Sequence, residues 1–192
     1  MSTPPVVLVD MDGVLADLET AFWDRWAVAH PDLPQRADAD ASRFLVLDQV
    51  GRRWADEVHA ITGAPGFFRD LAPVDGAVTA MREMLADGID VRICTAPLLA
   101  NPTCASDKLA WADRHLGDGW SARVVVTRDK TLVRGDLLVD DKPDVTGVLT
   151  PTWRHVAFDA PANRTSTTAA HRLRGWATWR RTLTPLLGRT AA

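Results

Sequence analysis

The chain has 192 residues with a net charge of −3, and 46% of them are hydrophobic and 24% charged, which is typical of a globular protein and excludes wholesale disorder. No apolar run approaches the roughly 20 residues of a membrane-spanning helix, and the start of the chain has no basic segment of the kind that opens a signal peptide. Two cysteines, Cys94 and Cys104, cannot make a disulfide framework or a cysteine-based zinc site, so we expect a soluble cytoplasmic protein.

Short apolar segments rich in β-branched residues predict five strands, at residues 6–9, 89–93, 123–126, 137–139 and 155–158. Near-continuous apolar runs of this length are typical of strands that are buried on both faces. Helical patterns alternate with these strands, among them 78–86 and 106–116, each closed by a nearby glycine. The alternation predicts an α/β fold with a central parallel sheet flanked by helices.

Almost eighty residues separate the first two predicted strands, far more than one crossover helix needs. The interval opens with a predicted helix at 19–29 and contains another at 55–61. We interpret residues 30–72 as a small, mostly helical cap, and residues 1–29 and 73–192 as the core. Ligands of open α/β sheets bind beyond the carboxyl ends of the strands, so a cap that leaves from the first strand would cover that crevice.

The end of the chain is basic. After Asp159 there is no acidic residue, whereas six arginines follow: Arg164, Arg172, Arg174, Arg180, Arg181 and Arg189. Apolar residues recur there at helical spacings, which predicts an amphipathic helix that docks its apolar side on the body; they are Leu173, Trp176, Leu183 and Leu187. Contact of the arginines with nucleic acid is the alternative, but no nucleic-acid-binding motif accompanies them.

Polar side chains follow four of the predicted strands. In strand order they are Asp10 and Asp12, then Thr95, then Lys130, then Asp140 with Asp141. Because parallel strands end at the same edge of a sheet, we expect these side chains to lie together. Crowded carboxylates are tolerable when a cation lies among them, and oxygen ligands suit Mg²⁺. Lysine and threonine suit phosphoryl oxygens, and a carboxylate beside a metal can accept a phosphoryl group, so the pattern predicts phosphoryl transfer.

Each piece alone has a second interpretation. The Asp-x-Asp-Gly stretch at 10–13 could be a turn, or a calcium loop, although the glutamate that ends an EF-hand loop is absent. Residues 140–143 could be a plain loop, and Cys94 is expected to be a small buried residue rather than a nucleophile. The order of the groups, each after a strand, is what makes the pattern specific.

Together these segments resemble the haloacid dehalogenase (HAD) superfamily phosphatases and, within them, the 5′(3′)-deoxyribonucleotidases. The resemblance is carried by residues 7–17, 67–77, 93–97, 108–111, 127–131 and 136–144. It implies a Rossmann-like core with a cap, and a Mg²⁺-dependent phosphomonoesterase that hydrolyses (deoxy)ribonucleoside monophosphates through an aspartyl phosphate. The implied partner is a small phosphate ester, with no nucleic acid and no membrane; a homodimer is left open.

The resemblance also implies a role for each motif residue. Asp10 is expected to be the nucleophile, and Asp12 the group that protonates the leaving oxygen and then activates water. Mg²⁺ is expected to bind Asp10, the backbone carbonyl of Asp12 and Asp141. One supporting carboxylate and two phosphate-binding donors complete the set: Asp140, and Thr95 with Lys130.

The positions that would select the substrate depart from the family. Leu18 stands where the family has phenylalanine, Arg53-Trp54 where the cap has Phe-Trp, and Ala96 where serine follows the threonine. We expect Trp54 to stack on a base, with burial inside the cap as the alternative. Arg53 could stack on a base or reach a second anionic group.

Lys108 and Arg128 are further candidates for the edge of the site. A lysine on a helix surface and an arginine in a surface ion pair are the alternatives.

Two other functions remain open. One is a phosphatase for another small phosphorylated metabolite, which the altered cap positions favour. The other is a phospho-acceptor signalling domain, but such domains carry the acceptor aspartate on a later strand.

The chain has eight tryptophans and no tyrosine. We expect Trp111, Trp176 and Trp179 to pack helices on the sheet, and Trp23 or Trp26 to face the cap or the crevice. Trp120 and Trp153 have no expected role.

Overall fold

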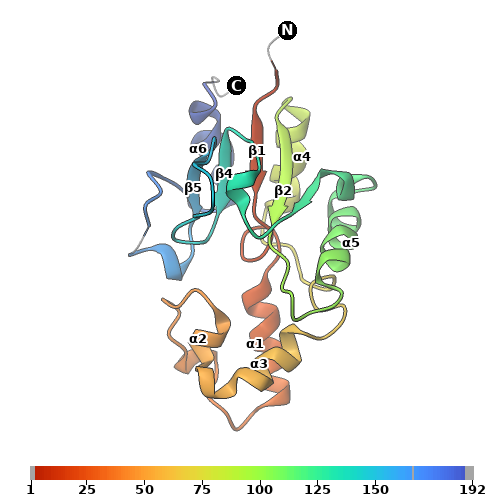
Figure 1. Ribbon diagram of the computed structural model, residues 1–192, viewed down its shortest axis with the longest axis vertical. Helices are drawn as coiled ribbons and strands as arrows, with labels where there is room; N and C mark the ends of the chain where they lie inside the picture. Colours follow the sequence, from red (N-terminus) through yellow and green to blue (C-terminus); the bar gives the residue numbers. More distant parts are fainter. Residues whose placement is uncertain (1–2, 166, 189–192) are drawn as a thin grey trace.

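A computed structural model describes residues 3–165 and 167–188. Its strands form a single parallel sheet in the order β3-β2-β1-β4-β5-β6 (Figure 1). Their bounds are β1 Val6–Val9, β2 Asp90–Thr95, β3 Val124–Val126, β4 Leu137–Asp140, β5 Arg154–Phe158 and β6 His171–Leu173. This confirms the predicted α/β fold. The strand order reverses between β1 and β4, which is where doubly wound sheets bind their ligands.

The centre of the sheet is fully buried. Residues 7–9 of β1 and 137–139 of β4 are completely buried, as their near-continuous apolar sequence predicts. Val9 pairs with Ile93 on one side and with Val139 on the other, so the carboxyl ends of the three central strands lie level. The polar residues that follow these strands therefore emerge at one edge of the sheet.

Helices lie around the sheet and beyond its carboxyl edge (Figure 1). Their bounds are α1 Leu18–Ala29, α2 Val46–Val50, α3 Ala55–Thr62, α4 Ala77–Ala86, α5 Cys104–Leu116 and α6 Trp179–Leu186. α4 packs against β2, α5 against β3 and α6 against β6. The predicted helices at 19–29, 55–61, 78–86 and 106–116 are confirmed to within two residues at each end, whereas α2 was not predicted. Within the described ranges, no helix is long and apolar enough to cross a bilayer.

Between β1 and α4 the chain forms α1, α2 and α3, which lie together in Figure 1. We call this stretch, residues 18–62, the insertion. Trp23 donates its indole N–H to Gln49 Oε1 (3.4 Å), and Trp26 donates to the Pro34 carbonyl (3.0 Å). Both tryptophans thus face the insertion, as expected for at least one of them. The division at residues 30–72 stays a prediction, and in space α1 lies beside the helices of that range.

The predicted C-terminal helix is wrong over its first part. Leu173 lies in β6 and pairs with Phe158, and Trp176 lies in a 3₁₀ helix, η6 (Trp176–Thr178). Gly175, with φ of +110°, separates the two elements, so α6 begins only at Trp179. Residues 171–173 form a strand rather than a helix because their pairing with β5 extends the sheet. The helical spacing of apolar residues does not reveal this tertiary interaction.

Leu173, Trp176 and Leu183 are nevertheless buried on the body, and Leu187 is partly buried against the same core, as expected for docking. Arg180 pairs with Glu83 on α4 (3.4 Å) and with Asp87, which directly follows that helix, and Arg172 pairs with Asp159 (2.8 Å). These arginines thus balance acids of the same chain. Arg189 lies outside the described residues.

Candidate active site

The nucleophile candidate, Asp10, follows β1 directly at the centre of the sheet. Its backbone N–H donates to the Val139 carbonyl (2.8 Å), which holds it beside the end of β4. Lys130, in the 3₁₀ helix η4 (Lys130–Leu132), places Nζ 2.6 Å from Asp10 Oδ1 and 2.5 Å from Asp140 Oδ2. One buried ammonium group therefore bridges the carboxylates that follow the two central strands.

Electrostatics keep this lysine charged. Burial alone would lower the pKa of Lys130, but the negative charges of Asp10 and Asp140 outweigh it and raise that pKa above its ordinary value. Burial and the neighbouring Asp10 charge raise the pKa of Asp140 to about 6. The site thus holds a charged ammonium group between the carboxylates of Asp10 and Asp140.

Three carboxylates meet at this edge. Asp10, Asp140 and Asp141 each place one oxygen within 4.8 Å of the others. Burial and the charges of Asp10 and Asp140 raise the pKa of Asp141 well above its usual range. Asp141 Oδ1 and Asp12 Oδ1 are buried, and neither finds a hydrogen-bond partner among the described residues. Clustered, unpartnered carboxylate oxygens fit a hard divalent cation such as Mg²⁺.

Asp12 points to a different partner, Lys108 of α5. Lys108 is completely buried, and its Nζ donates to Asp12 Oδ2 (2.7 Å), Thr95 Oγ1 (2.7 Å) and the Ala96 carbonyl (2.8 Å). The ring centroid of Phe68 lies 5.1 Å from the same nitrogen. All three ammonium hydrogens are used, so the surface interpretation of Lys108 is wrong.

The carboxyl group of Asp12 is suited to hold a proton. Burial raises its pKa, the Lys108 charge opposes this, and the Asp10 charge adds to it; the net effect is a raised pKa. Asp10 and Asp12 thus stand two residues apart, each beside its own lysine, in different electrostatic surroundings.

The loop that carries both aspartates is tightly wound. The Met11 carbonyl accepts from the N–H groups of Leu15 and Ala16 (2.8 Å each). Gly13 has φ of +76°, and a Cβ added there would lie 2.2 Å from Asp141 Oδ2. Glycine is required on both counts, since other residues rarely adopt this conformation and none would leave room for the carboxylate.

The other predicted substrate residues are more scattered. Leu18 begins α1, and Ala96 is exposed directly after Thr95. Arg53 and Trp54 lie in η2 (Arg52–Trp54), where the Arg53 guanidinium lies 5.3 Å from the Trp54 ring centroid.

Trp54 Nε1 is buried with no hydrogen-bond partner in the described ranges, and Arg128 is exposed. Among the described residues, no hydrogen bond or ion pair joins Arg53, Trp54 or Arg128 to the carboxylate cluster.

Asn163 was missed by sequence reasoning. It ends the 3₁₀ helix η5 (Pro161–Asn163), is completely buried, and donates to the Asp141 carbonyl (2.7 Å). Its sequence context, Pro-Ala-Asn, is typical of a turn, so nothing there marks it.

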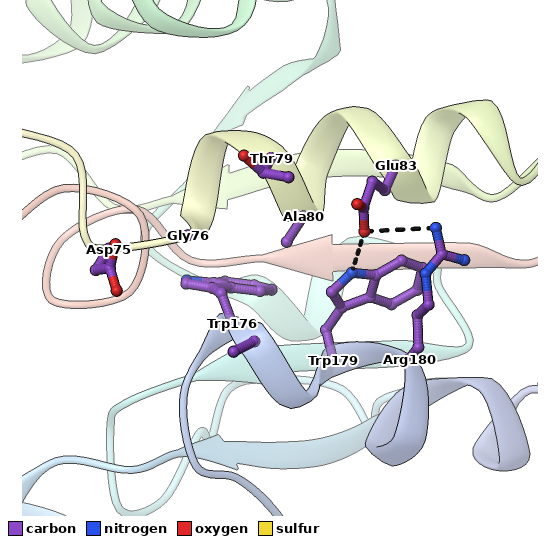
Figure 2. Close-up of a pocket in the computed structure, with 9 residues that line it drawn as sticks. Asp75, Gly76, Thr79, Ala80, Glu83, Trp176, Trp179 and Arg180 are labelled. Atoms are coloured by element: carbon purple, nitrogen blue, oxygen red, sulfur yellow. Dashed lines mark hydrogen bonds and ion pairs between the residues drawn. The ribbon is translucent and has the colours of Figure 1, made fainter.

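A hollow of about 360 Å³ lies between α4 and the C-terminal segment, away from the carboxylates (Figure 2). Its polar lining comes from α4, α6 and the residue before Gly76: Asp75, Thr79, Glu83 and Arg180. It contains none of the residues that follow the strands, so the candidate active site is the carboxylate edge.

Residues 4–184 match the protein family described as 5′ nucleotidase, deoxy (Pyrimidine), cytosolic type C protein. The chain belongs to this family. The resemblance inferred from the motifs is thereby confirmed, and with it the assignment as a deoxyribonucleotidase-like phosphatase, a phosphoric monoester hydrolase.

Relatives extend along the whole chain. A Bordetella bronchiseptica protein, provisionally named a 5′(3′)-deoxyribonucleotidase, is 47% identical over 187 residues, which is 97% of this chain and 100% of that protein. The human 5′(3′)-deoxyribonucleotidase, cytosolic type, is 44% identical over 164 residues, covering 82% of this chain and 81% of its own. A HAD family hydrolase from Deinococcus radiodurans, crystallised with phosphate and sodium, shares the fold at 18% identity, with a TM-score of 0.57 and full coverage of both chains.

Proposed function

We propose that this protein is a Mg²⁺-dependent phosphomonoesterase that hydrolyses (deoxy)ribonucleoside monophosphates through an aspartyl phosphate. The observation that carries the proposal is the pairing of two carboxylates with two buried lysines. Asp10 lies beside Lys130, and Asp12 lies beside Lys108, at the switch point of a doubly wound sheet. The names of the relatives, 5′(3′)-deoxyribonucleotidases, support a nucleoside monophosphate as the substrate.

In the first step, an Asp10 oxygen attacks the phosphorus atom and the bond from phosphorus to the ester oxygen breaks. Asp12 gives its proton to that oxygen, which leaves as the alcohol. In the second step, a water oxygen attacks the phosphorus of the aspartyl phosphate while Asp12 takes the proton from the water. The bond from phosphorus to Asp10 then breaks, and inorganic phosphate leaves.

The remaining residues hold the phosphate. Thr95 and Lys130 offer a hydroxyl and an ammonium donor. Lys108 already donates to Asp12, Thr95 and the Ala96 carbonyl, so its role is to hold Asp12 and Thr95 in place. Asp10, Asp141 and the Asp12 carbonyl would hold Mg²⁺, with Asp140 in support. When bound, the cation neutralises negative charge on the phosphoryl oxygens. The cytoplasmic location and the homodimer stay predictions.

Asp10→Asn tests the mechanism. The variant keeps the size of the side chain but removes the attacking carboxylate, so hydrolysis should be lost while the circular dichroism spectrum is unchanged. Asp118→Asn, the same change at an exposed position, should keep full activity. Full activity in Asp10→Asn would overturn the aspartyl-phosphate proposal.

A second candidate, a phosphatase for another small phosphorylated metabolite, is favoured by the exposed Ala96 and by Arg53 in the insertion. Alanine has no hydroxyl to offer a phosphate, and arginine can bind a second anionic group. A substrate panel separates the two. Turnover of dUMP or dTMP far above that of p-nitrophenyl phosphate and sugar phosphates supports the nucleotide, whereas equal rates support the second candidate.

A further inference from the structure

Asn163 lies where the pairing between β4 and β5 ends. The register of the two strands ends at Asp140 and Ala157, and the carbonyls of the next residues, Asp141 and Phe158, both turn toward Asn163. Its Nδ2 donates to each of them at 2.7 Å. An amide nitrogen carries two hydrogens, so this one side chain satisfies both carbonyls and ties the two strand ends together.

The orientation of the amide is set by Arg172 of β6. Arg172 Nη1 lies 2.5 Å from Asn163 Oδ1, and Nη2 lies 2.9 Å from the Asn163 carbonyl. The same Nη1 donates to Asp159 Oδ1 (2.8 Å). Because a guanidinium group only donates, the amide oxygen must face Arg172 and the amide nitrogen must face the two carbonyls. The asparagine therefore has a single arrangement that satisfies all its neighbours.

Asp141 is consequently held from two sides. Asn163 fixes its carbonyl, and so the direction in which its side chain leaves the backbone. On the other side its carboxylate lies against Gly13, where a Cβ would come within 2.2 Å of Oδ2. Between these supports Oδ1 is buried without a hydrogen-bond partner in the described residues, and one oxygen of this carboxylate lies within 4.8 Å of oxygens of Asp10 and Asp140.

We propose that Asn163 is a positioning residue for the metal centre, acting through the backbone of Asp141. The inference rests on the proposed function, in which Asp141 binds Mg²⁺. The side chain of Asn163 makes its hydrogen bonds to the Asp141 and Phe158 carbonyls, to Arg172 and to the Ala160 N–H, so it acts on Asp141 through the backbone. Groups that orient a metal ligand from behind contribute strongly to affinity, and their loss costs about 10-fold to 100-fold in metal binding.

Asn163→Ala tests this by calorimetric titration of Mg²⁺ into the substrate-free protein. We expect a Kd for Mg²⁺ about 10-fold or more weaker than in the wild type. The Mg²⁺ concentration for half-maximal activity should rise by the same factor, while kcat at saturating Mg²⁺ is largely kept.

Asn101→Ala is the matched control. Asn101 is also buried and also donates Nδ2 to two backbone carbonyls, those of Thr62 and Ala64 (2.9 Å each), but not to the metal candidates. It should lose stability without any change in the Kd for Mg²⁺. A merely structural role for Asn163 would make the two variants behave alike.

The outcomes separate the two proposals. A wild-type protein that takes up no Mg²⁺ overturns the metal role in the proposed function. A wild type that binds Mg²⁺ while Asn163→Ala binds it equally well overturns the role of Asn163 alone. If Asn163→Ala does not fold, Arg172→Lys is used in its place. Lysine keeps the positive charge but lacks the two guanidinium nitrogens that contact Asn163 Oδ1 and the Asn163 carbonyl. Unchanged Mg²⁺ affinity in that variant also overturns the inference, and weaker affinity supports it.

Discussion

Lys108 and Asp12 form an ion pair inside the protein, with Nζ 2.7 Å from Oδ2, although ninety-six positions separate them in the chain. The lysine side chain is completely buried, whereas the aspartate side chain keeps 28% of its surface exposed. Burying an ammonium group is costly unless it is paired and hydrogen-bonded. Here the lysine joins the loop after β1, which carries Asp12, to the end of β2, since the same nitrogen also contacts Thr95.

Lys108→Met should lower kcat/KM by roughly 10²-fold, because Asp12 and Thr95 both lose the ammonium group that positions them and a small misplacement of reacting groups can cost that much. Methionine keeps the length of the side chain and its apolar contacts, so the loss would report the ammonium group. Steady-state kinetics with a nucleoside monophosphate measures it. Arg114→Met, which removes an exposed charge from the same helix, should change kcat/KM little. Similar rates for both variants would contradict a role for Lys108.

Gly13→Ala should weaken Mg²⁺ binding as well as stability. The new methyl group would meet Asp141 Oδ2 at 2.2 Å and must displace that carboxylate. Gly88→Ala is the control, because Gly88 has nearly the same φ, +75°, but nothing within 4 Å of the added Cβ. Both variants pay for the left-handed conformation, about 1 kcal/mol. Calorimetry should show weaker Mg²⁺ binding in Gly13→Ala alone; equal affinities would show that Asp141 tolerates the displacement.

The stabilisation by Mg²⁺ should depend on pH. The pKa of Asp140 is raised from 3.8 to about 6, and that of Asp141 is raised as well. Between the unfolded and folded pKa values the folded protein binds more protons, so the metal-free protein loses stability as the pH rises from about 4 to about 6. Mg²⁺ would bind the ionised form of Asp141 and would be favoured by the negative charge of Asp140 beside it, so it would compete with these protons. The gain in Tm on adding Mg²⁺ should therefore be small at pH 5 and large at pH 7.5, by thermal unfolding with and without EDTA. An equal gain at both pH values would argue that these carboxylates do not bind the cation.

The placement of Asp10, Thr95, Lys130 and Asp140 could be predicted because two simple patterns coincide. Buried strands appear in the sequence as short apolar runs, and parallel strands end together, so the residues that follow them must share one edge of the sheet.

The strand order argues against a phospho-acceptor signalling domain. Here β1 lies between β2 and β4, whereas the flavodoxin-like order of receiver domains places β1 between β2 and β3. The phospho-acceptor alternative therefore does not fit this sheet.

What the sequence could not reveal depends on long-range packing. A lysine in the middle of a helix is usually exposed, and only the fold shows that Lys108 points inward beneath Asp12. Residues 171–173 carry two polar side chains and no strand pattern, yet they form β6 because β5 offers them an edge. Asn163 acts through backbone carbonyls, whose positions no residue pattern encodes.

Trp176→Phe should destabilise the loop that carries Asp10 and Asp12. The Trp176 indole N–H donates to the Val14 carbonyl (2.8 Å) in a fully buried position, and phenylalanine would leave that carbonyl unsatisfied. The expected loss in the free energy of unfolding is about 1–3 kcal/mol, measured by urea denaturation.

Trp179→Phe provides the comparison, since its indole donates to Glu83 Oε2 (2.9 Å) in a partly buried position beside Arg180 (Figure 2). Glu83 keeps its ion pair with Arg180 and its contact with water when the indole is lost, so this variant should lose less stability than Trp176→Phe. The two substitutions remove the same atoms, so the difference between their losses in stability separates the effect of the buried hydrogen bond from that of the smaller ring.

Because Val14 lies between Asp12 and the start of α1, Trp176→Phe should also lower kcat, whereas Trp179→Phe should not. Equal losses of stability, with kcat unchanged in both, would mean that Trp176 supports the catalytic loop only by filling space.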